Sequence, residues 1–429
     1  MQKTYSKFFF LLMLLSLTFS ISAAPHIRSM IVFGDSLSDN GNTTHLLKSL
    51  RFEENPEYLV RPFKLFIIHR MEDFADDYYV PQYVLDAGIE IVEDFFDHEL
   101  GPMLANLISQ VRLVPVLPGE PYWQNRFSNG RVWEEYLAPM LNIDREDKSQ
   151  FDVQAFGGSW AVTYDYQLTV WNLIRHPIET IKTLVVGKLI PPSLGLTVQA
   201  WLLMNDKVSS DDLVFLFTGG NDYLNVLRFE DNYNPNVMSS YIDNVLDGIE
   251  YSIRKLIMNG AEKLVIMNLP DISVTPRFVY TTDKPVLASA VMLHNQRLQQ
   301  RINVLRIEFP QVTFVTIDIP KLMGSLMANP SAHGFKYIDK PCIDVKLPMY
   351  RLLKTPFQHN PSLDLAQVIN YHSAKFGRGK KNYHRCDDEA HYMFWDEVHP
   401  STRTHQWFAF KVCEKLNQEG FETNCQLPG

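Results

Sequence analysis

The chain has 429 residues, of which 46% are hydrophobic, and a formal net charge of −9. This length accommodates one large domain or two modest ones. The negative charge excludes the basic footprint of a nucleic-acid-binding protein, so no nucleic-acid partner is expected. Beyond the first two dozen residues, no run of 18 apolar residues predicts a membrane-spanning helix.

The N-terminus has the pattern of a secretory signal peptide. Two lysines precede an apolar run over residues 8–15, and small residues follow. Such a segment is too short to span a membrane comfortably and is removed on export. We predict a signal peptide over 1–23 and secretion of the mature chain, 24–429, through the periplasm. A retained N-terminal anchor is the alternative.

The first strand signal leads into a turn that carries a candidate nucleophile. Residues 30–33 are apolar and predict a buried strand, and Gly-Asp-Ser-Leu follows at 34–37. Asn-Gly-Asn at 40–42 favours a turn. Ser36 therefore lies at the carboxyl end of a strand, where open parallel sheets bind their ligands. The alternative is a turn serine that caps a backbone amide.

Strand and helix signals alternate in the second half of the chain. Strands are predicted at 213–217, 264–267 and 312–317, and helices around 242–256, at 287–307 and from Pro400 onward. This alternation predicts an α/β protein with a parallel sheet and helices on its faces, forming a single domain.

Two segments do not fit this alternation and read as insertions, at about 44–117 and 164–205. The second is rich in aliphatic residues and contains Trp171 and Leu184. A contiguous apolar patch often marks a binding face, which makes this segment a candidate for lipid contact. Packing on the core explains the same residues equally well.

Three further blocks complete an acyl-transfer site. Asp396 and His399 stand three apart, so the carboxylate can orient the imidazole towards a serine, although a surface ion pair has the same spacing. Asn221 follows the 213–217 strand and can donate to an oxyanion. The glycines at 157–158 can offer an unobstructed backbone amide. Taken singly, Asn221 and the glycines are also ordinary turn residues.

No metal or cofactor is expected. The sequence has neither a Cys-x-x-Cys pair nor a His-Glu-x-x-His motif. A calcium loop built on Asp35, Asp39 and Asn40 is disfavoured because the regular alternation of oxygen ligands is absent.

The four blocks at 34–37, 157–158, 220–222 and 396–399 resemble the four sequence blocks of the SGNH (GDSL) hydrolases. The segments at 126–133, 268–271 and 294–295 are similar to the secreted bacterial branch, above all to phospholipases A that are also glycerophospholipid:cholesterol acyltransferases. The resemblance covers nearly the whole mature chain except 44–117, and it thins out across 164–205 and 343–385.

The resemblance implies a three-layer, flavodoxin-like fold and a role for each block. Ser36 would be the nucleophile, His399 the base and Asp396 its partner. The amides of Ser36 and Gly158 and the side chain of Asn221 would form the oxyanion hole. The motif does not decide which of the two glycines contributes its amide to the oxyanion hole. Gly158 is preferred because its spacing from the start of the block fits better.

The resemblance also implies phospholipid and lysophospholipid substrates, cholesterol as an acyl acceptor, and contact with a membrane surface. Two alternatives stay open, an SGNH esterase of non-lipid specificity and a non-catalytic lipid-binding effector.

Four cysteines lie in the last quarter of the chain, and in an oxidising compartment they predict two disulfides with three connectivities. The most local choice pairs Cys342 with Cys386 and Cys413 with Cys425. The first bridge would tether a loop over 343–385, whose basic stretch at 374–385 has no acidic residue. Exposed loops of this kind are nicked by proteases. In the acyltransferases that this chain resembles, such a loop is cut to raise activity, so an activating protease is an expected partner.

Overall fold

The computed structural model describes residues 27–52, 78–100, 118–161, 193–205, 207–224, 234–345 and 383–426, together with short stretches between 61 and 76. Several sequence predictions lie outside these residues: the signal peptide at 1–23, Trp171 and Leu184, and the part of the tethered loop at 346–382. Among the described residues, no helix is both long and apolar enough to cross a bilayer.

A five-stranded parallel sheet forms the centre of the molecule, in the order β2-β1-β3-β4-β5. Its strands are β1 (Ser29–Gly34), β2 (Phe151–Ala155), β3 (Asp212–Phe217), β4 (Lys263–Met267) and β5 (Thr313–Ile317). The α/β fold of the SGNH hydrolases is thereby confirmed. Sequence analysis did not predict β2, because Asp152 and Gln154 interrupt its apolar residues on this half-buried edge strand.

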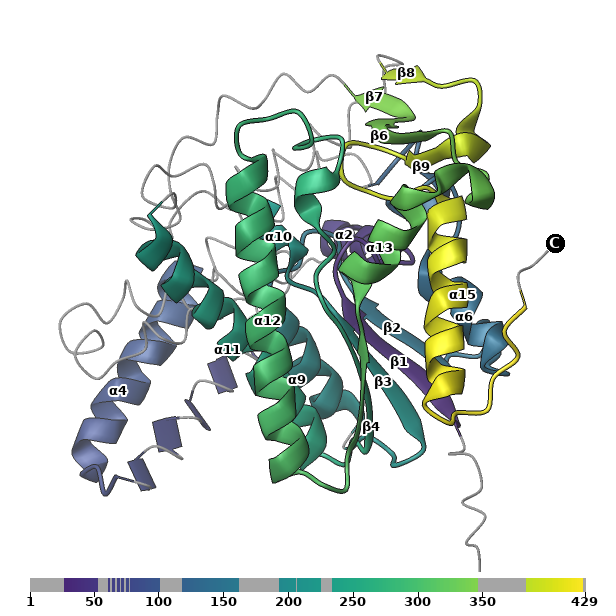
Figure 1. Cartoon of the computed structure of the whole chain (residues 1–429). Helices are drawn as coiled ribbons and strands as arrows, with labels where there is room; N and C mark the ends of the chain where they lie inside the picture. Colours follow the sequence, from purple (N-terminus) through teal and green to yellow (C-terminus); the bar gives the residue numbers. More distant parts are fainter. Residues whose placement is uncertain are drawn as a thin grey trace, which may run out of the picture.

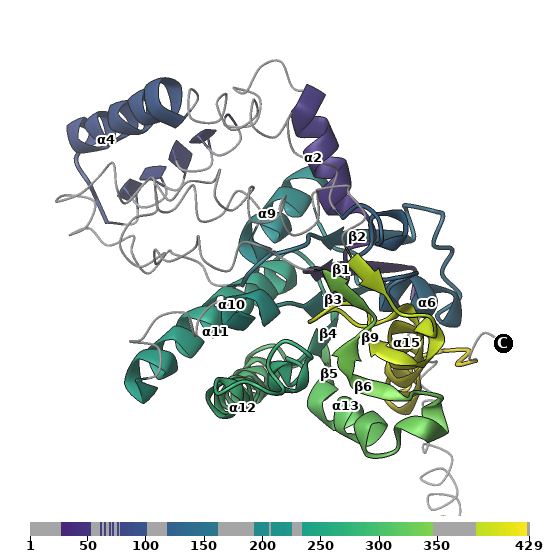
Figure 2. The same cartoon turned by 90° about the horizontal axis from the view of Figure 1, so that it is seen from above.

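Side chains of the central strands alternate between two hydrophobic cores. Ile31 and Phe33 join the core on one face of the sheet, whereas Met30 and Val32 join the core on the opposite face. Figures 1 and 2 show the resulting three layers, with the sheet between the two helical groups. Both faces are covered, which explains why β1 and β3 are buried along their whole length.

The helices that cover the sheet have these bounds: α6 (Trp133–Met140), α9 (Leu194–Asn205), α11 (Pro235–Met258), α12 (Lys284–Glu308), α13 (Ile319–Ala328) and α15 (Thr402–Gln418). Buried residues of α11 recur at spacings of three and four, from Ile242 to Leu256, as the helix prediction required. Asn234 caps its first turn by accepting from the Asn236 N–H.

The two insertions differ in how they relate to the core. The first contains α2 (Asn42–Phe52), α4 (Gln82–Asp94) and the π-helical turn η1 (Phe95–Leu100), and in both views α4 lies apart from the sheet. The described end of the second is α9, whose Val198 and Trp201 are buried in the core. Core packing therefore explains these two side chains, whereas Leu203 and Met204 near the end of α9 are exposed.

Short strands follow α13 and lead to the acid–base motif. They are β6 (Tyr337–Pro341), β7 (Ile343–Val345), β8 (Tyr383–Arg385) and β9 (Tyr392–Phe394), with β6 paired to β9 and β7 to β8. Disulfides join Cys342 to Cys386 and Cys413 to Cys425, the more local of the three connectivities.

Candidate active site

Three neighbouring strands end at the same level and bring three of the four blocks together. Gly34 at the end of β1 is in register with Ala155 of β2 and with Phe217 of β3. Ser36 lies two residues beyond Gly34, while Gly158 and Asn221 lie three and four residues beyond the other two strand ends. Because parallel strands share their carboxyl edge, these blocks meet at the rim of the sheet.

A tight turn directly after β1 presents Ser36. The Asp35 carboxylate accepts from the Leu37 N–H at 3.0 Å, and the Ser38 N–H donates to the Asp35 carbonyl at 3.0 Å. At Gly34, a Cβ atom would lie 2.8 Å from the Phe217 carbonyl oxygen, so the first residue of the motif must lack a side chain.

Ser36, His399 and Asp396 form a continuous hydrogen-bonded chain. The Ser36 Oγ atom lies 2.8 Å from His399 Nε2, and His399 Nδ1 lies 2.7 Å from Asp396 Oδ2. All three residues are buried, so water competes little for these bonds. With Nδ1–H donating to the carboxylate, Nε2 can accept the serine proton, which is the arrangement of a serine hydrolase.

The Asp-x-x-His spacing lets the two oxygens of the Asp396 carboxylate bind different donors. Asp396 Oδ1 accepts from the backbone N–H groups of Val398 and His399, each at 2.8 Å, which leaves Oδ2 to face the imidazole. The Trp395 N–H closes the turn by donating to the His399 carbonyl at 2.8 Å. The two residues therefore share one rigid turn.

The predicted start of the last helix at Pro400 is wrong by two residues. The helix α15 begins at Thr402, and the Ser401 side chain caps it by accepting from the Thr404 N–H. Pro400 instead lies before the cap, in an antiparallel bridge with Phe394.

The two glycines of the second block serve different purposes. The Gly157 N–H is held by the Asp39 carboxylate at 2.9 Å and the Thr43 hydroxyl at 2.7 Å. Gly158 has a φ of 84°, in the left-handed region that favours glycine. Because Gly157 already has acceptors for its N–H, Gly158 remains the candidate for the oxyanion hole.

Asn221 is the second residue of the short helix α10 (Gly220–Leu224), which follows β3 after two residues. Its Nδ2 donates to the Ser159 carbonyl at 2.8 Å, which fixes the amide next to the glycine block. An amide nitrogen carries two hydrogens, so this bond leaves a second one for an oxyanion.

The segment at 126–133 packs against the turn that carries Asp396 and His399. The Phe127 ring lies 5.2 Å from the His399 ring, and the Ser128 hydroxyl donates to the Pro400 carbonyl at 2.9 Å. The Trp133 indole N–H donates at 2.9 Å to the hydroxyl of Ser38, two residues beyond Ser36. This one segment thus contacts both the turn that carries His399 and the turn that carries Ser36.

Sequence analysis missed Tyr122. Its hydroxyl donates to Asp396 Oδ2 at 2.6 Å, the same oxygen that faces His399 Nδ1. Burial and the charge of Asp396 raise the pKa of Tyr122 well above 10, so the hydroxyl keeps its proton. No sequence signal points to this contact, because 274 residues separate the two partners.

Two titratable residues next to the candidate site, Asp35 and His405, have shifted pKa values. Burial raises the pKa of Asp35 to about 7, with Asp222 and Asp39 adding repulsion. Burial and the neighbouring His399 lower the pKa of His405 to about 3, so His405 is neutral. The His405 imidazole of α15 therefore adds no positive charge beside His399 at neutral pH.

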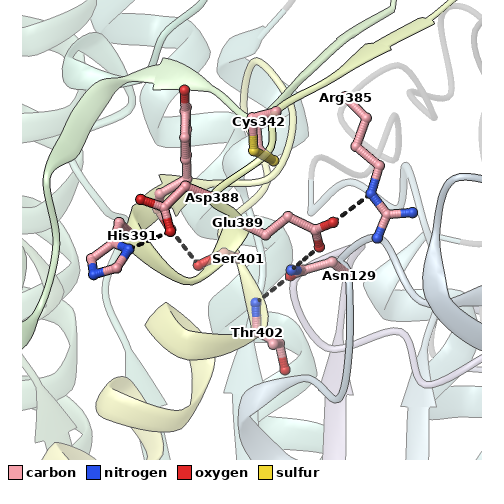
Figure 3. The surroundings of a disulfide bond; sticks show 10 residues. Asn129, Cys342, Arg385, Asp388, Glu389, His391, Ser401 and Thr402 are labelled. Atoms are coloured by element: carbon pink, nitrogen blue, oxygen red, sulfur yellow. Dashed lines mark hydrogen bonds and ion pairs between the residues drawn. A yellow bond between two sulfur atoms is a disulfide. The ribbon is translucent and has the colours of Figure 1, made fainter.

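The Cys342–Cys386 disulfide is connected by backbone hydrogen bonds to the segment just before Asp396. The N–H groups of Cys342 and Ile343 donate to the carbonyls of Phe394 and Trp395, the two residues before Asp396. Figure 3 shows the polar contacts around this disulfide. Glu389 accepts hydrogen bonds from the Arg385 guanidinium and from the Asn129 amide. The Asn129 side-chain oxygen in turn accepts from the Thr402 N–H at the start of α15.

The fold and this hydrogen-bonded site define the class of protein as an α/β serine hydrolase of the SGNH type. More particularly, the family model described as GDSL-like Lipase/Acylhydrolase matches residues 30–412. The chain belongs to this family and is an enzyme of the GDSL lipase and esterase group.

Curated relatives are similar at low identity. Phosphatidylcholine-sterol acyltransferase of Aeromonas hydrophila is 28% identical over 308 residues, which cover 66% of this chain and 78% of the relative. Thermolabile hemolysin of Vibrio parahaemolyticus is 24% identical over 298 residues, with coverage of 69% and 57%. Secreted effector protein SseJ of Salmonella typhimurium is 21% identical over 320 residues, with coverage of 74% and 62%. The chain thus spans less than two thirds of the hemolysin and of the effector.

Proposed function

We propose that this protein is a secreted lipolytic serine hydrolase that cleaves phospholipids, as a phospholipase A, and lysophospholipids. We propose further that it transfers acyl groups to a sterol such as cholesterol. The observation that carries the proposal is the buried chain of bonds from Ser36 through His399 to Asp396. The similarity to a phosphatidylcholine-sterol acyltransferase supports the lipid substrate and the sterol acceptor.

In the proposed reaction, the Ser36 oxygen attacks the ester carbonyl while His399 Nε2 takes the hydroxyl proton. The amides of Ser36 and Gly158 and the second Asn221 hydrogen stabilise the negative charge on the carbonyl oxygen. The C–O bond of the ester then breaks, and the leaving alcohol receives the proton from His399. Water or a sterol hydroxyl attacks the acyl-enzyme by the same route and frees Ser36.

Contact with a lipid surface is proposed for the start of α4. Tyr83 of α4 is 76% exposed, and Tyr78 and Tyr79, which precede this helix, are 69% and 93% exposed. The helix α4 itself lies apart from the sheet (Figure 1). Tyrosine rings combine an apolar body with a polar tip and are enriched where membranes meet water. These residues give the insertion a function that packing on the core does not supply.

Export by the 1–23 segment and activation by cleavage of the disulfide-tethered loop remain proposals that rest on the sequence. Both segments lie outside the described residues, apart from the anchors of the loop. The disulfide between those anchors would keep the two fragments of a cut chain together.

A serine-directed fluorophosphonate probe, followed by analysis of lipid products, tests the proposal. The wild-type protein should be labelled and Ser36→Ala should not, and phosphatidylcholine vesicles should yield lysophospholipid and fatty acid. Cholesterol in the vesicles should add cholesteryl ester to the products. A protein that binds vesicles but takes no label would be a non-catalytic lipid-binding protein. A labelled protein that cleaves only acetyl or short aryl esters would be a non-lipid esterase.

A further inference from the structure

The carboxylate of Asp396 is held from two sides by side chains. Oδ2 accepts from His399 Nδ1 at 2.7 Å and from the Tyr122 hydroxyl at 2.6 Å, while Oδ1 accepts from two backbone amides. A carboxylate that shares its charge among several donors is a weaker partner for any one of them. The tyrosine therefore moderates the attraction between Asp396 and a protonated His399.

The loop that carries Tyr122 is built to keep the hydroxyl in place. The Tyr122 N–H donates to the Gly119 carbonyl at 3.0 Å, and the Trp123 N–H donates to the Ser128 carbonyl at 2.9 Å. The Tyr122 ring meets Phe127 edge to face at 6.3 Å, and Phe127 in turn lies against His399. One loop thus contacts the acid through Tyr122 and the base through Phe127.

We propose that Tyr122 is a positioning residue for the serine hydrolase proposed above. Its hydroxyl holds the Asp396 carboxylate against His399 and determines where the acid limb of the pH–rate profile lies. The inference rests on the proposed function, because it concerns the same Ser36, His399 and Asp396.

Neighbouring groups do not supply the same effect. On α15, His405 faces His399 but is neutral, because burial keeps its pKa at about 3. Glu397 faces Tyr122 from the turn itself and adds a negative charge, which opposes ionisation of the phenol. Ser36, the remaining partner of the imidazole, is neutral before the reaction. Tyr122, in contrast, donates a hydrogen bond to the carboxylate from outside the turn.

The test compares Tyr122→Phe with the wild type by the pH dependence of two rates. One is the rate of phosphonylation of Ser36 by a fluorophosphonate, and the other is kcat/KM for a short soluble aryl ester. Without the hydroxyl, the carboxylate has one donor fewer and interacts more strongly with the imidazolium. The acid limb of both profiles should move up by about 0.5–1 pH unit, and the rate at the plateau should fall by less than about tenfold.

Tyr136→Phe is the matched control. It likewise removes a single tyrosine hydroxyl, here from a half-buried side chain whose hydroxyl is bonded at 2.8 Å to the uncharged Thr402 side chain. Its acid limb should coincide with that of the wild type. An acid limb that moves equally in both variants would show a general loosening and would overturn the inference.

A second measurement covers the case in which Tyr122→Phe does not fold. 3-Fluorotyrosine incorporated at position 122 keeps the ring and the hydroxyl but makes the hydroxyl a stronger donor. The acid limb should then move to lower pH, opposite to the shift in Tyr122→Phe. Profiles that coincide with the wild type in every folded variant would overturn the inference alone. A wild-type protein that takes no label at Ser36 would overturn the proposed function, and this inference with it.

Discussion

The Phe127 ring occupies the space that a side chain at Gly157 would need. An ideal Cβ atom at position 157 would lie 2.2 Å from Phe127 Cζ, far inside van der Waals contact. The same ring lies 5.2 Å from the His399 ring. The glycine block and the acid–base block are therefore coupled through one aromatic side chain.

Gly157→Ala should consequently impair turnover without touching a reacting group. Either the Phe127 ring shifts and displaces His399, or the backbone shifts and displaces the Gly158 amide. A misplacement of about 1 Å can reduce the rate by roughly 10². We expect kcat for a soluble ester to fall by about that factor.

Gly324→Ala is the matched control, because a Cβ atom there meets nothing within 4 Å. It should leave kcat unchanged and, within α13, should not destabilise the protein. Adding Phe127→Leu to Gly157→Ala should relieve the overlap, so that the double variant loses less than the two single effects combined. Strict additivity would contradict the steric explanation.

Replacing the reacting groups should give a graded series. Ser36→Ala or His399→Ala should lower kcat by several orders of magnitude, because members of a triad act as a unit. Asn221→Ala should lower kcat by about 10²–10³ if its amide donates one bond to the oxyanion. Each rate would be measured with a soluble ester, and folding would be checked by the melting temperature.

Asn417→Ala is the control for this series, since the Asn417 amide donates to the Thr423 hydroxyl at the exposed end of α15. Its kcat should equal that of the wild type. Undiminished turnover in Asn221→Ala would remove this residue from the proposed mechanism.

The two disulfides should differ in their effect on activity. Cys342 and Ile343 donate to the carbonyls directly before Asp396, whereas Cys413 and Cys425 tie the end of α15 to the C-terminal tail. Cys342→Ala with Cys386→Ala should therefore lower kcat as well as stability. Loss of the bridge should destabilise the fold by about 4 kcal/mol on the chain-entropy model.

Cys413→Ala with Cys425→Ala should lower the melting temperature but keep kcat at temperatures where the protein is folded. The measurement is kcat at a temperature well below both melting transitions. Equal kcat values for the two double variants would show that the first bridge does not support the acid–base turn.

Asp35 should make the protein less stable as the pH rises. Burial raises its pKa from 3.8 to about 7, so the folded state binds a proton that the unfolded state has already released. Its ionisation therefore reduces the free energy of unfolding progressively between about pH 4 and pH 7. The loss is complete above that range.

Asp35→Asn should remove this dependence, because the amide oxygen can still accept from the Leu37 N–H. Relative to the wild type, the variant should gain stability at pH 8, by up to about 4 kcal/mol, and little at pH 4. Urea unfolding at the two pH values measures the difference. If the variant were destabilised by the same amount at pH 4 and at pH 8, ionisation of the buried Asp35 would not be the cause of the pH dependence.

The sequence by itself determined the fold class and pointed to the Ser36, Asp396 and His399 that the structure brings together. Apolar runs such as 213–217 mark buried strands whatever surrounds them, because both faces of a parallel sheet are covered. The Ser36 turn and the Asp396–His399 spacing are local, and each depends on bonds within four residues. Short-range chemistry of this kind can be read from the order of residues.

Only the tertiary structure decided which distant groups meet. It placed Tyr122 on Asp396, and it set Phe127 between Gly157 and His399. It also turned the weakly apolar β2 into a strand by pairing it with β1. These contacts depend on how loops cross at the carboxyl edge of the sheet, and no local periodicity encodes that crossing, because its partners lie tens to hundreds of residues apart.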